Sequence, residues 1–116
     1  MADTLHAIAA HKTGLDAPQA FALGTLCNGL VCLAVWLSFA ARSVTDKVLA
    51  IVFPVAAFAA IGFEHSIANM FLLPWAIAVP GGGDLSIAGA GANLAVVTLG
   101  NIAGGTLLVA AVYWSV

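Results

Sequence analysis

Charged side chains are scarce in this sequence. Asp, Glu, Lys and Arg make up 7% of its 116 residues, and three basic residues against five acidic ones give a formal net charge of −2. A surface that binds nucleic acid needs clustered cations to neutralise phosphate groups, and three basic residues do not supply such a cluster. We therefore expect no nucleic-acid partner.

Motifs of the common enzyme classes are also missing. The sequence contains no GxGxxG fingerprint, no Walker phosphate loop, no HExxH motif and no plausible serine-nucleophile constellation. Its two cysteines, Cys27 and Cys32, would lie about 140° apart around one helix, so they can neither bridge each other nor chelate a metal together. We expect no enzyme activity, no cofactor and no metal, and we expect both cysteines to be small packing residues.

Apolar residues, in contrast, are abundant. They make up 63% of the chain, and the mean hydropathy is +1.11. Soluble domains are roughly half apolar, so this composition is typical of a membrane protein. We therefore expect an integral membrane protein in contact with the lipid bilayer. We further expect it to be all-α and multi-pass and to lie in the cell's inner (plasma) membrane.

Long uncharged runs define the expected membrane segments. Residues 17–41 would reach roughly 37 Å as a helix, more than the hydrocarbon core of about 30 Å. We expect this segment to be one span and residues 92–114 to be another, with a further membrane segment at residues 48–79 between them. Residues 1–16 form a weakly amphipathic segment ahead of the first span. All of these segments belong to a single transmembrane unit.

The few polar segments indicate how the spans are oriented. Residues 42–47 contain two of the three basic residues, so by the positive-inside tendency we expect this loop, from Arg42 to Lys47, to face the cytoplasm. Residues 80–84 form a flexible, acidic connection on the opposite side. His6 and His11, ahead of the first span, are expected to face solvent or the membrane interface.

The second apolar region is too long for one straight membrane helix. Residues 48–79 would extend about 48 Å, and Glu64 and His65 divide them into two uncharged pieces that are each too short to span alone. Gly62 stands just before this pair. An interrupted apolar segment with polar groups at its break is typical of a binding site built on a discontinuous helix. We therefore predict three transmembrane helices, of which the second is discontinuous.

Small residues in the third span indicate a packing surface. Gly100 and Gly104 form a GxxxG pattern, which lets another helix backbone approach closely. We expect this face to contact a neighbouring helix.

Two ionisable residues stand at the predicted break. An ionised carboxylate at mid-bilayer costs about 2.5–3.5 kcal/mol on insertion scales, so such residues are functional candidates. We favour a functional role for His65, because an unperturbed imidazole exchanges protons near neutral pH. For Glu64, a functional role and a role in orienting its surroundings are equally open. The alternative for both is a mutual structural pair or an interfacial position.

Each expected membrane segment also carries an amide side chain. Asn28 lies in the first, Asn69 lies one turn after His65, and Asn101 lies in the third. A hydrogen bond between helices is the favoured explanation for any one of them. Their convergence with His65 on one polar axis would favour a functional role.

Phe58 and Lys12 each have two interpretations. Phe58 lies about two turns before His65, where an aromatic ring either packs or forms a hydrophobic constriction that excludes hydrated ions. Lys12 belongs either to an interfacial helix or to a positive site that attracts anions at a pore mouth. Together these residues indicate a passive or proton-coupled pathway across the membrane.

Three stretches of the sequence resemble a known family. CNGLVCLAVW at 27–36, FPVAAFAAIGFEHSIANMF at 53–71 and LGNIAGG at 99–105 closely resemble the formate/nitrite transporter family. The resemblance covers nearly the whole chain from Lys12 onward, and GFEHSIANM is its most specific part. It implies an aquaporin-like protomer of six helices, built from two inverted three-helix repeats, and a pentamer of such protomers. This chain resembles the second repeat alone.

The resemblance also implies roles for single residues. His65 matches the central pore histidine, which offers a proton or hydrogen bond to the anion. Phe58 and Val31 match residues of two hydrophobic slits. The polar positions that shape the anion's electrostatics or brace the histidine are matched by Lys12, Asn28, Glu64, Asn69 and Asn101.

The substrate that the resemblance implies is a small monovalent anion. FEHSIANMFLLP is more similar to the formate-channel branch than to the nitrite branch, so formate is expected, as the anion or the weak acid, and nitrite or hydrosulfide is the alternative. Because the first repeat is missing, the expected partners are a complementary N-terminal repeat and further copies in a homo-pentamer. The alternative from a different class of function is a membrane subunit that transports nothing and whose glycines and asparagines serve assembly alone.

Overall fold

The structure, a computed structural model, describes residues 1–81 and 85–115, and every regular element in these ranges is a helix. Residues 82–84 of the expected acidic connection lie outside the described residues. In chain order the elements are α1 (Ala2–Thr13), α2 (Ala17–Ala40), α3 (Val44–Ile61), α4 (Ser66–Ala78), α5 (Ile87–Ala103), the π-helical segment η1 (Gly104–Ala110) and α6 (Ala111–Trp114).

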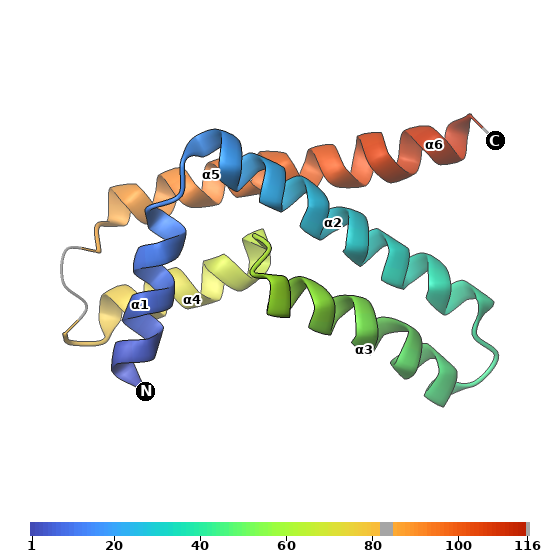
Figure 1. Cartoon of the computed structure of the whole chain (residues 1–116), viewed down its shortest axis with the longest axis horizontal. Coiled ribbons are helices and arrows are strands. Elements are labelled where there is room, and N and C mark those ends of the chain that lie inside the picture. The colour runs from blue at the N-terminus through green and yellow to red at the C-terminus, as the bar shows by residue number, and fades with distance from the viewer. Residues whose placement is uncertain (82–84, 116) are drawn as a thin grey trace.

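Three of these helices are long and apolar enough to cross a membrane. They are Ala17–Ala40, Val44–Ile61 and Ile87–Trp114, the last of which comprises α5, η1 and α6 in one continuous rod (Figure 1). α4 is apolar but shorter. The described part of the chain thus has the composition and helix lengths of a membrane protein.

α2 lies at the centre of the arrangement. It packs against α5 and η1 and also against α3, while α4 packs against α5, and α1 crosses α4 and α5 (Figure 1). The molecule measures 48 × 31 × 18 Å. Its shortest dimension is less than two helix diameters of about 10–12 Å each. Most helices therefore expose an apolar face, and α3 contributes a single buried residue, Pro54.

The close contact of α2 with α5 and the start of η1 depends on glycine. A Cβ atom at Gly100 would overlap the carbonyl group of Phe21, and a Cβ atom at Gly104 would overlap that of Thr25. Without side chains at these positions, the two backbones touch. The predicted packing role of the GxxxG pattern is confirmed, and the neighbouring helix is α2 of the same chain.

α3 begins within the loop that the sequence predicts at residues 42–47. Ser43 is its N-cap: the hydroxyl accepts a hydrogen bond from the backbone N–H of Asp46, and the Asp46 carboxylate accepts one from the backbone N–H of Ser43. This capping box satisfies N–H groups at the helix start. Residues 44–47 are therefore the first turn of a helix and not part of a loop.

The third long helix also begins earlier than the membrane segment expected from residue 92. Ser86 Oγ accepts a hydrogen bond of 2.9 Å from the backbone N–H of Gly89, so the helix begins at Ile87. Serine is one of the favoured N-cap residues for this reason. The part of this helix that lies within a membrane stays a prediction.

α1 is docked against the other helices. The apolar cluster between α1, α4 and α5 contains Leu5, Ala9, Leu73, Ala76 and Ala90. His6 is also buried, with 8% of its surface exposed, whereas His11 is exposed. The expectation that His6 faces solvent or the interface is therefore wrong, because Leu5 and Ala9 turn this face of α1 inward.

Candidate functional site

The chain leaves helical conformation between α3 and α4. Gly62 ends α3 with φ of +80°, in the left-handed region that favours glycine, and its N–H donates to the carbonyl of Ala59. Helix resumes at Ser66, after His65 as N-cap. Glu64 therefore lies inside the break between α3 and α4. Figure 1 shows where the chain bends between these two helices.

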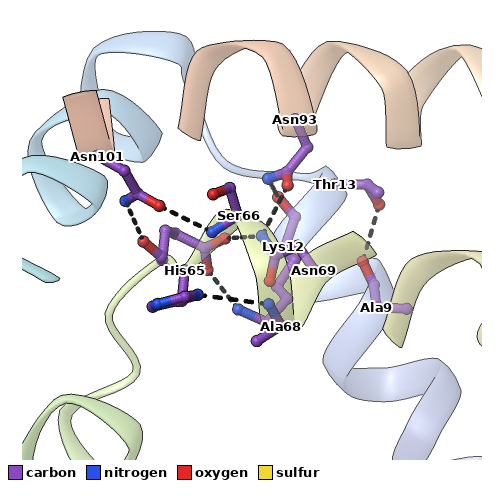
Figure 2. Close-up of polar contacts among 10 residues, drawn as sticks. Ala9, Lys12, Thr13, His65, Ser66, Ala68, Asn69, Asn93 and Asn101 are labelled. Carbon is purple, nitrogen blue, oxygen red and sulfur yellow. Dashed lines mark hydrogen bonds and ion pairs between the residues drawn. The ribbon is translucent and has the colours of Figure 1, made fainter. Parts of the chain in front are cut away.

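Asn101 of α5 satisfies the backbone groups of this break. Its Oδ1 accepts a hydrogen bond of 2.9 Å from the N–H of Ser66, and its Nδ2 donates to the carbonyls of Glu64 at 3.0 Å and Gly24 at 2.8 Å. Figure 2 shows the amide reaching toward Ser66. Non-helical backbone in apolar surroundings needs such partners. One buried side chain of α5 thus connects α2, the break and the start of α4.

A buried ion pair lies beside the break. Lys12 Nζ donates to Glu64 Oε1 at 2.7 Å, and the two side chains are 15% and 1% exposed. The second carboxylate oxygen, Oε2, accepts a hydrogen bond of 2.6 Å from Nδ2 of Asn69 on α4. Glu64 therefore pairs with Lys12 and not with His65, and the charge of Lys12 is compensated.

Asn93 of α5, which the sequence pattern did not single out, extends this network. Its Oδ1 accepts a hydrogen bond of 2.9 Å from Asn69 Nδ2, and its Nδ2 donates to the backbone carbonyl of Lys12 at 2.8 Å (Figure 2). It connects α5 with α4 and with the end of α1. The available signal was an amide in an apolar run about two turns before Asn101.

His65 lies against Phe58. The two rings are stacked, with centroids 5.6 Å apart and 19° between their planes. Nδ1 of His65 accepts a long hydrogen bond of 3.4 Å from the N–H of Ala68, at the start of α4 (Figure 2). With Nδ1 as acceptor, a neutral imidazole carries its proton on Nε2. Nε2–H is then the hydrogen-bond donor that the ring can offer.

Asn28 and Val31 lie half-buried on α2. Asn28 Nδ2 donates to the backbone carbonyl of Asn101 at 2.5 Å, close to the point where α5 passes into η1. A side chain inserted into the helix ladder is a recognised cause of such a distortion. Within residues 1–81 and 85–115, no hydrogen bond joins a predicted asparagine to the His65 ring. The predicted asparagines instead surround Glu64 and backbone groups of the helices.

The site offers hydrogen bonds and charge. No group of three or more His, Cys, Asp and Glu side chains could hold a metal ion in the part of the chain that the structure describes. The N-terminus of α4 carries N–H groups and a helix dipole that favour negative charge. An imidazole N–H and a compensated lysine lie at or near this helix end. Such groups are suited to a small anion.

Comparison with known proteins identifies relatives of this chain. Residues 1–115 match the family model described as formate/nitrite transporter. The chain is 43% identical over 121 residues to the formate channel FocA of Escherichia coli (strain K12). The aligned region covers 90% of this chain and 42% of that protein. It is 50% identical over 96 residues to a probable formate transporter of Methanothermobacter thermautotrophicus. This aligned region covers 83% of this chain and 34% of that protein.

Solved structures show the same relationship. A pentameric formate channel with formate bound has a TM-score of 0.90 and 45% identity, covering 97% of this chain and 51% of the other. An FNT family ion channel has a TM-score of 0.88 and 41% identity. The match covers 97% of this chain and 45% of that channel. This chain spans about half or less of the length of these relatives. It is a membrane protein, and it belongs to the formate/nitrite transporter family.

Proposed function

We propose that this chain is one half of a transporter for a small monovalent anion, and that the anion is formate. The observation that carries the proposal is that His65 lies between the end of α3 and the start of α4, stacked on Phe58. Formate channels among the relatives support the choice of anion.

The physical basis is the difference between an anion and its neutral acid. A bare anion loses its hydration on entering a narrow apolar passage, which costs far more free energy than the entry of an uncharged acid. Phe58 and Val31 would line two such constrictions. His65, with Nε2–H as its donor, would give the anion a hydrogen bond or a proton between them. Flux should therefore rise as the pH falls.

The polar network would set the electrostatics of this passage. We infer that α3 and α4 together form one discontinuous membrane crossing, so the N-terminus of α4 lies within the bilayer and favours an anion. Lys12, Asn28, Glu64, Asn69 and Asn101 would brace this helix end. Because Glu64 compensates Lys12, the cluster adds little net positive charge, and a passing anion would not be trapped.

A complete pathway would need the rest of a protomer. The chain is one thin layer of helices with exposed apolar faces, and it spans about half of its solved relatives. We propose that a complementary N-terminal repeat, inverted relative to this one, covers the pore-forming face. Five such protomers would assemble in the cell's inner membrane, with residues 42–47 toward the cytoplasm.

The experiment is pH-dependent formate uptake into liposomes that contain this chain, alone or with the first repeat supplied as a second chain. Uptake in the second preparation supports the proposal. Competition by nitrite or hydrosulfide that is stronger than competition by unlabelled formate would reassign the substrate. No uptake in either preparation would favour the non-transporting assembly subunit.

A further inference from the structure

His6 makes two hydrogen bonds that the proposed pathway does not use. Its Nε2 lies 3.1 Å from the carbonyl oxygen of Ala76 and 3.1 Å from that of Val79. Carbonyl oxygens only accept, so Nε2 carries the proton and donates to both. The ring comes from α1, whereas both carbonyls lie at the end of α4.

The sequence explains why the end of α4 needs an outside donor. In a continuing helix the carbonyl of Ala76 would accept from the N–H of residue 80, but that residue is Pro80, which has no N–H. Ala76 is fully buried, so water is not a ready substitute. A buried carbonyl without a partner is unfavourable. His6 supplies the donor that proline removes.

The same helix carries Lys12 to the ion pair. His6 and Lys12 are about 9 Å apart along the axis of α1. Near Lys12 the helix is held by Asn93, which donates to the Lys12 carbonyl at 2.8 Å. Near its start it is held by His6. These three hydrogen bonds and the apolar cluster that contains Leu5 and Ala9 hold α1 in place.

We propose that His6 is a positioning residue that fastens α1 to the end of α4 and thereby holds Lys12 against Glu64. The link to transport rests on the proposed function, in which this ion pair sets the electrostatics of the anion path. The link between His6 and Lys12 rests only on the contacts of α1 with α4 and α5.

The test uses the two lysines of the chain, Lys12 and Lys47. Lys12 is mostly buried and paired, whereas Lys47 is exposed and serves as an internal reference. An amine-acylating reagent is applied to the bilayer-embedded protein, and the ratio of Lys12 to Lys47 modification is measured by mass spectrometry. The variants are His6→Leu, which removes the donor, His6→Gln, which keeps an N–H donor at similar reach, and His11→Leu as the exposed control.

We expect His6→Leu to raise the ratio about tenfold, because α1 opens more often when a buried carbonyl loses its partner. His6→Gln should restore the wild-type ratio, and His11→Leu should not change it. An equal increase of the Lys12-to-Lys47 ratio in His6→Leu and His6→Gln would show that the His6 ring only fills space. An unchanged ratio in both variants would show that His6 does not fix the position of Lys12. Either result overturns the proposal.

Formate uptake by the same variants, with the first repeat supplied, tests the final link. His6→Leu should lower uptake about fivefold or more, and His6→Gln should retain it. If His6→Leu raises the Lys12-to-Lys47 ratio but leaves formate uptake at the wild-type level, the link between His6 and transport is wrong. Absence of uptake from every preparation, wild type included, would count against the proposed function, while the acylation ratio would still decide whether His6 holds Lys12.

Discussion

Lys12 and Glu64 are 52 positions apart in the sequence, yet their Nζ and Oε1 atoms are 2.7 Å apart in a nearly solvent-free contact. The pair joins the end of α1 to the break between α3 and α4. Replacing both partners of such a pair by neutral groups is often tolerated, whereas removing one leaves an uncompensated buried charge.

This asymmetry gives a prediction for stability. Lys12→Met should destabilise the protein by about 3–5 kcal/mol, because Glu64 is left charged and buried. The double variant Lys12→Met/Glu64→Gln should recover most of the loss, because a glutamine oxygen still accepts from Asn69. Thermal unfolding in detergent measures both variants. A single variant as stable as the double variant would contradict a buried ionised Glu64.

The break itself was predictable from local sequence, but the partner of Glu64 was not. Gly62, Glu64 and His65 interrupt an apolar run. The polar side chains and the glycine that adopts a positive φ stand within a few residues of one another, so a short stretch of sequence is enough to indicate the break. The pairing of Glu64 with Lys12 depends on how α1 crosses α4 and α5, which no periodicity encodes. The same applies to His6: Pro80 marks a carbonyl of α4 that lacks its helical partner, but no local pattern indicates that His6 is the donor.

Packing of α2 against the continuous rod of α5 and η1 gives a second prediction. Gly104→Ala would bring a Cβ into the carbonyl of Thr25 and should destabilise the protein by about 1–3 kcal/mol. Gly91→Ala on the same helix is the control, since nothing lies within 4 Å of its Cβ position, and it should be neutral or slightly stabilising. Unfolding curves that rank Gly104→Ala equal to Gly91→Ala would be inconsistent with this backbone contact.

Asn101 gives a third prediction. Asn101→Ala leaves the N–H of Ser66 and the carbonyl of Glu64 without their side-chain partner, at a cost of about 1–3 kcal/mol. Hydrogen exchange at the Ser66 amide should then accelerate about tenfold or more. The Ala20 amide, which bonds to the Asp16 carbonyl at the start of α2, is the internal control. Unchanged exchange at Ser66 would mean that Asn101 does not stabilise the break.

Phe58 gives a fourth prediction, about selectivity. If its ring forms a constriction next to His65, Phe58→Ala should raise acetate uptake relative to formate uptake by about tenfold. Phe71→Ala is the control, because Phe71 is 70% exposed on α4. Both variants are measured in liposomes with the first repeat supplied. Equal acetate-to-formate ratios in the two variants would remove Phe58 from the pathway.

The role of the central histidine is tested most directly by the pH dependence of formate flux. This flux is measured for wild type and for His65→Ala, each with the first repeat supplied. We expect wild-type flux to rise as the pH falls and the variant to lose about a hundredfold in rate, because hydrogen bonding and proton transfer at Nε2 are both removed. We also expect the variant to lose the acid stimulation. A variant with the wild-type rate and the wild-type pH profile would contradict a histidine-centred pathway.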